Sequence, residues 1–172
     1  MRERGGLCRS GQSPRGGPLV LVAEKELNEW TGASGDDYEL ACAIDDLGVI
    51  QFSAGGQALV FWDEPARTTY FQRLRIFVQW IYADPGCDVE QAASELGDIA
   101  WEQGPTMDVS GPMVLLDAAA PGAEIQINQV RGAMDAEAIS VEIASGRYRV
   151  DCGEIRPDER TYFRCYRLMA VA

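Results

Sequence analysis

The stretch "GGPLVLV", residues 16–22, opens the patterned part of the chain, and a similar stretch, "SGPMVLLD", follows at residues 110–117. In each stretch a proline precedes an uninterrupted apolar run. Proline fixes φ and cannot donate a hydrogen bond, which suits the first residue of a strand, and a short continuous apolar run is typical of a strand buried on both faces. Neither stretch has the further glycines or the lysine of a phosphate-binding loop. We therefore predict two interior strands and no nucleotide site.

The two Gly-Pro stretches also begin two halves in which similar elements follow in the same order. Residues 17–21 match 111–115, residues 52–55 match 143–146, and residues 69–71 match 161–163, at offsets of about 91 to 94 residues. Nearly constant offsets favour a pseudo-repeat with halves over residues 16–84 and 110–172. The alternative is that β-rich chains reuse the same turn chemistry.

Alternation of apolar and polar residues, bounded by Gly and Pro, predicts the remaining strands. They cover residues 48–53, 57–62, 73–84, 124–130, 138–144, 147–155 and 161–171. Glycine-bearing turns predict hairpins between 48–53 and 57–62 and between 138–144 and 147–155. Short helices are predicted at 23–30, 36–45 and 88–100, with an extended connector at 101–110. We expect a mainly β or α+β fold: a mostly antiparallel sheet of two similar β-rich halves, with a few short helices, around one core.

Composition and charge restrict the class of protein. The chain has 172 residues, 47% of them hydrophobic, and a net charge of −12. Residues 1–15 are rich in Arg, Gly and Ser and predict a disordered basic tail before a single domain over 16–172. This tail has no apolar segment of a secretory signal, and no apolar run in the chain could cross a bilayer, so we expect a cytoplasmic protein. An acidic body repels nucleic acid and anionic membranes and attracts a basic partner.

The cysteine and histidine counts restrict the kinds of active site, metal site and disulfide that the chain could contain. The chain has five Cys and no His. An odd number of cysteines without C-x-x-C spacing argues against a disulfide framework and against structural zinc, so most of these cysteines are expected to be buried, inert thiols. The absence of His excludes Ser-His and Cys-His nucleophilic arrangements. We therefore expect no metal and no cofactor.

Paired acids are the remaining candidates for a site: Asp36 and Asp37, Asp45 and Asp46, and Asp63 and Glu64. A carboxylate-dependent hydrolase needs two carboxylates held together in a cleft, and nothing in the pattern places these pairs so. They can equally be solvated loop residues or part of a binding surface. Trp62 beside Asp63 and Glu64 at a hairpin end has the composition of a protein-binding hot spot. Alternating arginines of the last strands are interpreted as their solvated face, pairing with acids across strands: Arg147, Arg149, Arg164 and Arg167.

An ordered set of stretches resembles the immunity protein 21 family, whose members are antidotes in bacterial polymorphic toxin systems. The set comprises "GGPLVLV" (16–22), "DYELACAID" (37–45), "GVI" (48–50), "QALVFWDEPARTTYF" (57–71), "FVQWIYAD" (77–84), "WEQGPT" (101–106) and "SGPMVLLD" (110–117), with "GRYRV" (146–150) matching more loosely. Residues 45–48 depart from the Asp-Gly-Tyr turn expected there.

The resemblance implies a mostly β fold, no catalysis and no catalytic residues. It also implies that the partner is a cognate toxin, which the chain neutralises by forming a complex. The acidity of the body then suggests a toxin with a basic surface, such as a nuclease, contacted by Asp36, Asp37, Asp45, Asp46, Trp62, Asp63 and Glu64. A hydrolase on a β scaffold and a non-catalytic structural or regulatory β module remain alternatives.

Overall fold

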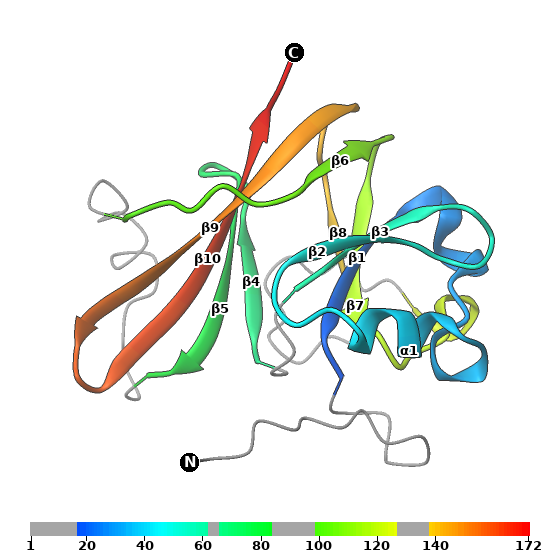
Figure 1. The fold of residues 1–172 in the computed structure, drawn as a ribbon, viewed down its shortest axis with the longest axis horizontal. Coiled ribbons are helices and arrows are strands. Elements are labelled where there is room, and N and C mark those ends of the chain that lie inside the picture. The colour runs from blue at the N-terminus through cyan, green and yellow to red at the C-terminus, as the bar shows by residue number, and fades with distance from the viewer. Residues whose placement is uncertain (1–16, 62–65, 84–98, 127–137) are drawn as a thin grey trace.

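The computed structural model describes residues 17–61, 66–83, 99–126 and 138–172, and its fold is mainly β (Figure 1). The described strands form two antiparallel five-stranded sheets, with orders β2-β3-β1-β7-β8 and β4-β5-β10-β9-β6. The strands are β1 (Leu19–Ala23), β2 (Gly48–Gln51), β3 (Gln57–Val60), β4 (Thr68–Phe71), β5 (Ile76–Tyr82), β6 (Thr106–Val109), β7 (Met113–Asp117), β8 (Ala138–Val141), β9 (Gly146–Asp158) and β10 (Thr161–Ala170). The helices are α1 (Asp37–Cys42) and the 3-10 turns η1 (Glu24–Glu29), η2 (Gly32–Ser34) and η4 (Gly122–Glu124).

The Gly-Pro stretches form the centre of the first sheet, which confirms their prediction. β1 and β7 pair antiparallel, with Leu21 opposite Leu115. Apolar side chains of both strands alternate between two layers. Leu21 and Leu115 join the core shared with the second sheet, whereas Val20 and Val114 pack on the other side with Trp30 of the helical segment. Burial on both faces explains why these strands are continuously apolar.

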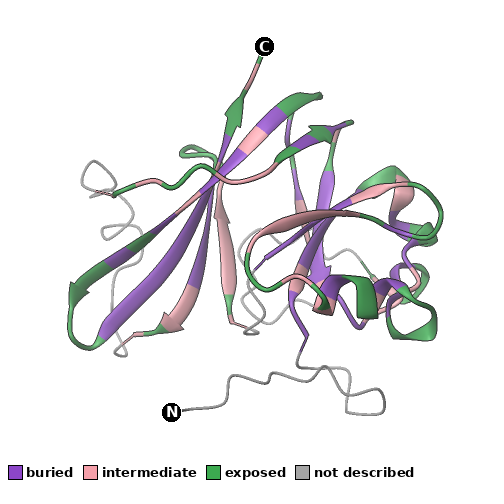
Figure 2. Cartoon of the chain, in the orientation of Figure 1, coloured by how far each residue is buried: buried purple, intermediate pink, exposed green. Residues whose placement is uncertain are grey.

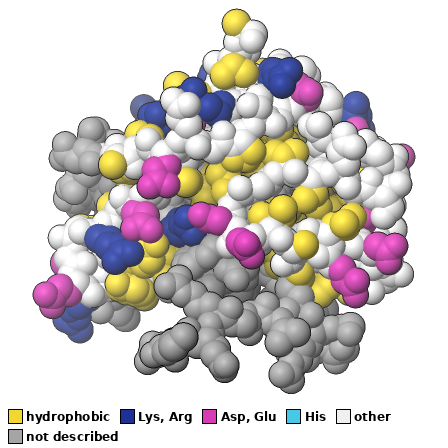
Figure 3. Space-filling view, in the orientation of Figure 1, with side chains coloured by type: hydrophobic (Ala, Val, Ile, Leu, Met, Phe, Trp, Pro, Cys, Tyr) yellow, Lys and Arg dark blue, Asp and Glu magenta, His cyan; other side chains and the backbone are white. Residues whose placement is uncertain are grey.

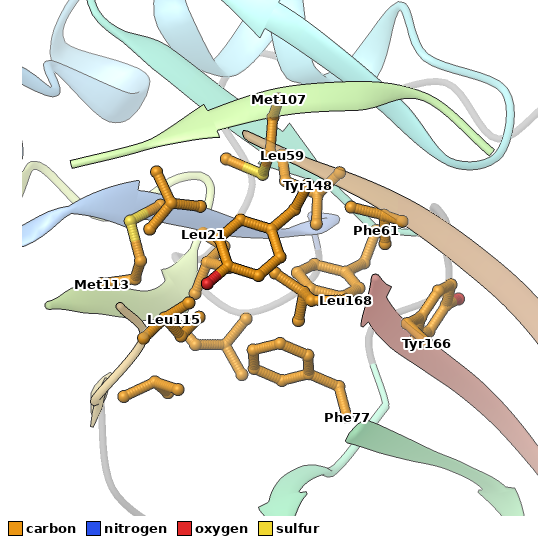
Figure 4. Packing of buried hydrophobic residues seen from close by; sticks show 14 of the residues in the cluster. Leu21, Leu59, Phe61, Phe77, Met107, Met113, Leu115, Tyr148, Tyr166 and Leu168 are labelled. Atoms are coloured by element: carbon orange, nitrogen blue, oxygen red, sulfur yellow. The ribbon is translucent and has the colours of Figure 1, made fainter. Parts of the chain in front are cut away.

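The second sheet packs its inner face against the first around a group of aromatic rings. Phe61, which follows β3, meets Phe77 of β5 at 5.3 Å and Tyr166 of β10 at 4.9 Å between ring centroids. Both contacts are edge-to-face, the favoured geometry for aromatic pairs. Figure 4 shows these rings converging with Leu21, Leu115 and Leu168 from facing strands. Most of the residues of β5, β9 and β10 near this contact are buried (Figure 2).

One predicted hairpin is confirmed and the other is wrong. β2 and β3 pair antiparallel around a loop in which Gly55 has a φ of 92°. β8, however, pairs with β7 in the first sheet, whereas β9 pairs with β10 and β6 in the second. The chain therefore crosses between the sheets at residues 142–145. Local alternation identifies both strands, but long-range packing chooses their partners.

Further differences concern element boundaries. β5 begins at Ile76 and not at residue 73, and it forms an unpredicted hairpin with β4 through a turn in which Arg75 has a φ of 55°. Gln79 of β5 is a polar residue, but it is buried and accepts a hydrogen bond from the Tyr166 hydroxyl at 3.0 Å.

The remaining differences also concern the residues at which strands and helices begin and end. β6 lies within the predicted connector, and β9 extends to Asp158, beyond the end predicted at residue 155. Residues 24–29 are 3-10 helical, and α1 covers only part of 36–45. Residues 122–124 are 3-10 helical at the start of the strand predicted at 124–130. The predicted tail (1–15), most of the predicted helix 88–100 and most of that strand lie outside the described residues.

Candidate functional site

Asp37 is a structural centre beneath α1. Its side chain is fully buried, with 0% exposed. One carboxylate oxygen accepts hydrogen bonds from the backbone N–H and the hydroxyl of Thr31, at 2.8 and 2.6 Å. The other accepts from the N–H and hydroxyl of Ser53, at 2.9 and 2.8 Å. Asp37 of α1 therefore connects Thr31, which precedes η2, to Ser53 in the β2–β3 loop.

These bonds keep the Asp37 carboxylate ionised. Burial alone raises the pKa of a carboxyl group, but the hydrogen bonds from Thr31 and Ser53 together outweigh burial and lower the pKa of Asp37 below its ordinary value. A carboxylate held by four donors inside the protein cannot contact a partner's surface. Asp37 is therefore a structural residue and not one of the exposed acids.

The other described acids of the prediction are exposed. Asp36, Asp45 and Asp46 lie around α1 with solvent-accessible side chains. Asp46 also pairs with Arg164 of β10 at 2.9 Å, where the arginine side chain is 10% exposed. This pair joins the loop after α1 to the second sheet, and the burial of Arg164 corrects its assignment to a solvated face. Trp62, Asp63 and Glu64 lie outside the described residues.

Charge is divided between the two sides of the molecule. Residues 17–61, which build β1–β3 and the adjoining helices, contain eight carboxylates and a single lysine. Segments 66–83 and 146–170, which build four strands of the second sheet, contain nine arginines and four acids. In Figure 3, magenta side chains predominate over β2, β3 and α1, whereas blue and magenta side chains are interspersed over β9 and β10. We call the exposed acids of the first group the acidic surface: Glu24, Glu29, Asp36, Glu39, Asp45 and Asp46.

The arginines of the second sheet surround a buried acid. Asp151 is 0% exposed and accepts bonds from Arg149 Nε at 2.5 Å and from Arg167 Nη2 at 3.0 Å. The hydrogen bond from Arg149 lowers the pKa of Asp151 most, with Arg167 adding to the effect. Arg167 also lies over the Trp101 ring, at 4.4 Å from its centroid. The prediction that arginines pair with acids across strands is confirmed for Arg167 and Asp151, which face each other in the β9–β10 register.

The described residues offer no arrangement suited to the hydrolase alternative. Of the described acid pairs, Asp36 is exposed while Asp37 is held by four donors, and both Asp45 and Asp46 are exposed. Within the described ranges, no group of three or more Cys, Asp or Glu could hold a metal ion. No helix among those ranges is long and apolar enough to cross a membrane.

The cysteines differ from one another. Cys152 and Cys165 are free thiols, and burial raises the pKa of Cys165 to about 12, so this thiol is inert at neutral pH. Cys42 is disulfide-bonded. Cys165 agrees with the expectation that most of the cysteines are buried, inert thiols, whereas the odd count and the spacing did not indicate the disulfide of Cys42.

The described part of the chain is a mainly β fold with a charged surface. The chain belongs to the immunity protein 21 family, whose model matches residues 13–161. Members of this family are typically non-catalytic inhibitors of toxins, so membership confirms that the chain is not an enzyme and implies that it binds and neutralises a cognate toxin. Comparison with curated proteins and with solved structures found no match.

The sequence contained a signal for the burial of Asp37 that its interpretation missed. Asp37 and Ala41 follow the helical spacing i, i+4 and lie on the inner side of α1, where both are fully buried. Asp36, the residue immediately before Asp37, is exposed like Glu39 and Leu40 on the outer side. Helical phase therefore distinguishes the structural acid from the exposed acids.

Proposed function

We propose that this protein neutralises a toxin with a basic surface, such as the nucleic-acid groove of a nuclease, by covering it with the acidic surface around α1. The observation that supports this proposal is the division of charge between the two sheets. Net negative charge on one side and net positive charge on the other give the molecule a directional field, which orients a basic partner during approach. Acids spread evenly would only increase solubility.

The acidic surface is also preorganised. Asp37 holds α1 and its flanking segments together, and Asp46 is anchored to Arg164. A rigid surface loses little conformational entropy on binding, which favours the tight complex that an antidote requires. Charge complementarity mainly raises the association rate, which matters when a toxin must be captured soon after synthesis.

The first experiment is co-expression with the toxin gene expected immediately upstream. We expect the full chain to restore growth and to co-purify with the toxin at fixed stoichiometry. Growth rescue without a complex, with conversion of a small molecule by the purified chain, would instead support the hydrolase alternative.

Neutralising the acidic surface tests which surface meets the toxin. Asp36→Asn, Glu39→Gln and Asp45→Asn together remove three exposed charges, and none of these side chains makes a hydrogen bond or ion pair with another described residue. We expect the association rate at low ionic strength to fall about tenfold, with a smaller change in the dissociation rate. Stopped-flow or surface-based kinetics against salt measure both.

The control variant changes net charge equally on other elements. Asp108→Asn, Glu142→Gln and Glu159→Gln remove three exposed acids from β6, from the crossing after β8 and from the β9–β10 turn. If both triple variants slow association equally, net charge and not the acidic surface governs capture. A wild-type rate that does not change with salt would reject electrostatic steering altogether.

A further inference from the structure

The outer face of the second sheet carries a shallow groove of about 470 Å³. Its lining comes from the β4–β5 turn, from the end of β10 and from Trp101, and includes Leu74, Arg75, Arg167 and Met169. Leu74 and Met169 are 43% and 40% exposed, among the most exposed large hydrophobic side chains that the structure describes. We call this cavity the outer groove. Exposed aliphatic side chains gathered at one cavity are typical of a binding surface.

The outer groove combines these aliphatic side chains with cationic donors. The Arg75 guanidinium makes no hydrogen bond or ion pair with a described residue, although the Arg75 carbonyl accepts a hydrogen bond from the Leu168 N–H at 3.4 Å. Arg75 lies in a left-handed backbone conformation, with φ at 55°. Arg167 uses Nε and Nη2 on Asp151, which leaves further donors of its five N–H groups for another acceptor. Arg, Met and Trp are enriched in protein interfaces. The groove therefore fits an aliphatic side chain flanked by carboxylates.

The chain itself presents such a ligand on the outer face of α1. Asp36, Glu39, Leu40 and Ala43 are all exposed and follow the spacing i, i+3, i+4, i+7 of one helical face. Leu40 is 40% exposed, and it lies on the same helical face as the two carboxylates. An exposed leucine beside acids matches the outer groove in both charge and apolar character, as in the recognition of a helix face by a groove.

We propose that the α1 face of one copy docks in the outer groove of a second copy. Because the two surfaces differ, the contact is head-to-tail, and each copy can bind one neighbour at each end. The contact is small, so the association is weak and forms at high protein concentration. Salt weakens it, because the attraction is between exposed charges. The α1 face belongs to the acidic surface, so a second copy and the toxin would compete for it, but the proposal does not depend on the toxin.

Analytical ultracentrifugation of the full chain alone provides the test. We expect the weight-average mass to exceed that of one chain as the concentration rises from about 10 µM to about 1 mM. Association should weaken about tenfold when ionic strength rises from about 0.05 to about 0.5 M. A single-chain mass over the whole concentration range would overturn the proposal.

Two variants and their mixture test the head-to-tail geometry. Leu40→Arg places a cation on α1, which the arginines of the groove repel, and the double variant Leu74→Ser, Met169→Ser removes the aliphatic side chains of the groove. Each variant alone should sediment as a single chain. An equimolar mixture should form a heterodimer, because one copy keeps an intact α1 face and the other an intact groove.

The matched control is Tyr82→Ser, which removes an equally exposed hydrophobic side chain, 47% exposed, from outside both surfaces. This variant should associate like the wild type. If Leu40→Arg still associates like the wild type, or if the mixture stays monomeric, the docking of α1 in the groove is wrong. Circular dichroism of each variant checks that it is folded. Because no toxin is present, failure here would leave the proposed toxin neutralisation untouched.

Discussion

Replacing Asp37 with asparagine is expected to lower the free energy of unfolding by about 3 kcal/mol. The amide keeps one acceptor oxygen for one pair of donors. Its NH₂ group then faces the N–H and hydroxyl of either Thr31 or Ser53, and those buried donors lose their acceptor. For a chain of 172 residues, this loss corresponds to a melting temperature lower by about 10 °C.

The same substitution should alter the dependence of stability on pH. Because the folded-state pKa of Asp37 lies below the ordinary carboxyl value of 3.8, its contribution is fully present above that value and disappears as the pH falls through the folded-state pKa. The variant should therefore lose less stability than the wild type on acidification below about pH 4. Urea unfolding at several pH values measures this difference.

Asp36→Asn is the matched control, because Asp36 precedes Asp37 but is exposed and has no hydrogen bond from its side chain. Its free energy of unfolding should stay within about 0.5 kcal/mol of the wild type. If Asp37→Asn proves equally mild, the carboxylate does not hold the α1 region in place. The proposal that Asp37 preorganises the acidic surface would then be wrong.

Asp151→Asn is expected to lower the free energy of unfolding by about 2 kcal/mol. The buried carboxylate accepts bonds from Arg149 and Arg167, and the amide can accept with only one oxygen while its NH₂ group opposes a guanidinium. Thermal or urea unfolding measures the loss. The pKa of Asp151 is also lowered, so its contribution is likewise lost at acid pH, as the pH falls through the folded-state pKa.

Glu154→Gln provides the comparison on the same strand. Glu154 pairs with Arg156 at 3.1 Å, but both side chains are about half exposed, at 47% and 54%. Exposed ion pairs contribute little, so we expect a change within about 0.5 kcal/mol. If Asp151→Asn and Glu154→Gln lowered the free energy of unfolding equally, the burial of Asp151 would not make its ion pairs more stabilising than an exposed one.

Much of the fold could be predicted because its central strands carry strong local signals. The apolar runs at residues 19–22 and 112–117 formed β1 and β7, and the glycine-bearing loop at residues 54–56 formed the β2–β3 hairpin. The β8–β9 pairing failed because alternation shows that a segment is a strand without showing its neighbour. β6 was missed because its four residues alternate too briefly between buried and exposed.

The surface could be predicted less well than the core. The exposure of Asp36, Asp45 and Asp46 follows from their polarity, whereas the burial of Asp37 depends on donors from Thr31 and Ser53. The outer groove combines residues from the β4–β5 turn with residues almost a hundred positions later. No local pattern contains that juxtaposition. The pseudo-repeat stays a prediction, although strands from both proposed halves contribute to both sheets.

The position of β10 has a consequence for protein synthesis. The last strand of the chain lies in the middle of the second sheet, between β5 and β9. β5 and β9 therefore gain their shared partner only when residues 161–170 have emerged from the ribosome, and the second sheet cannot close before then. A stop codon placed before residue 161 should therefore abolish neutralisation of the toxin.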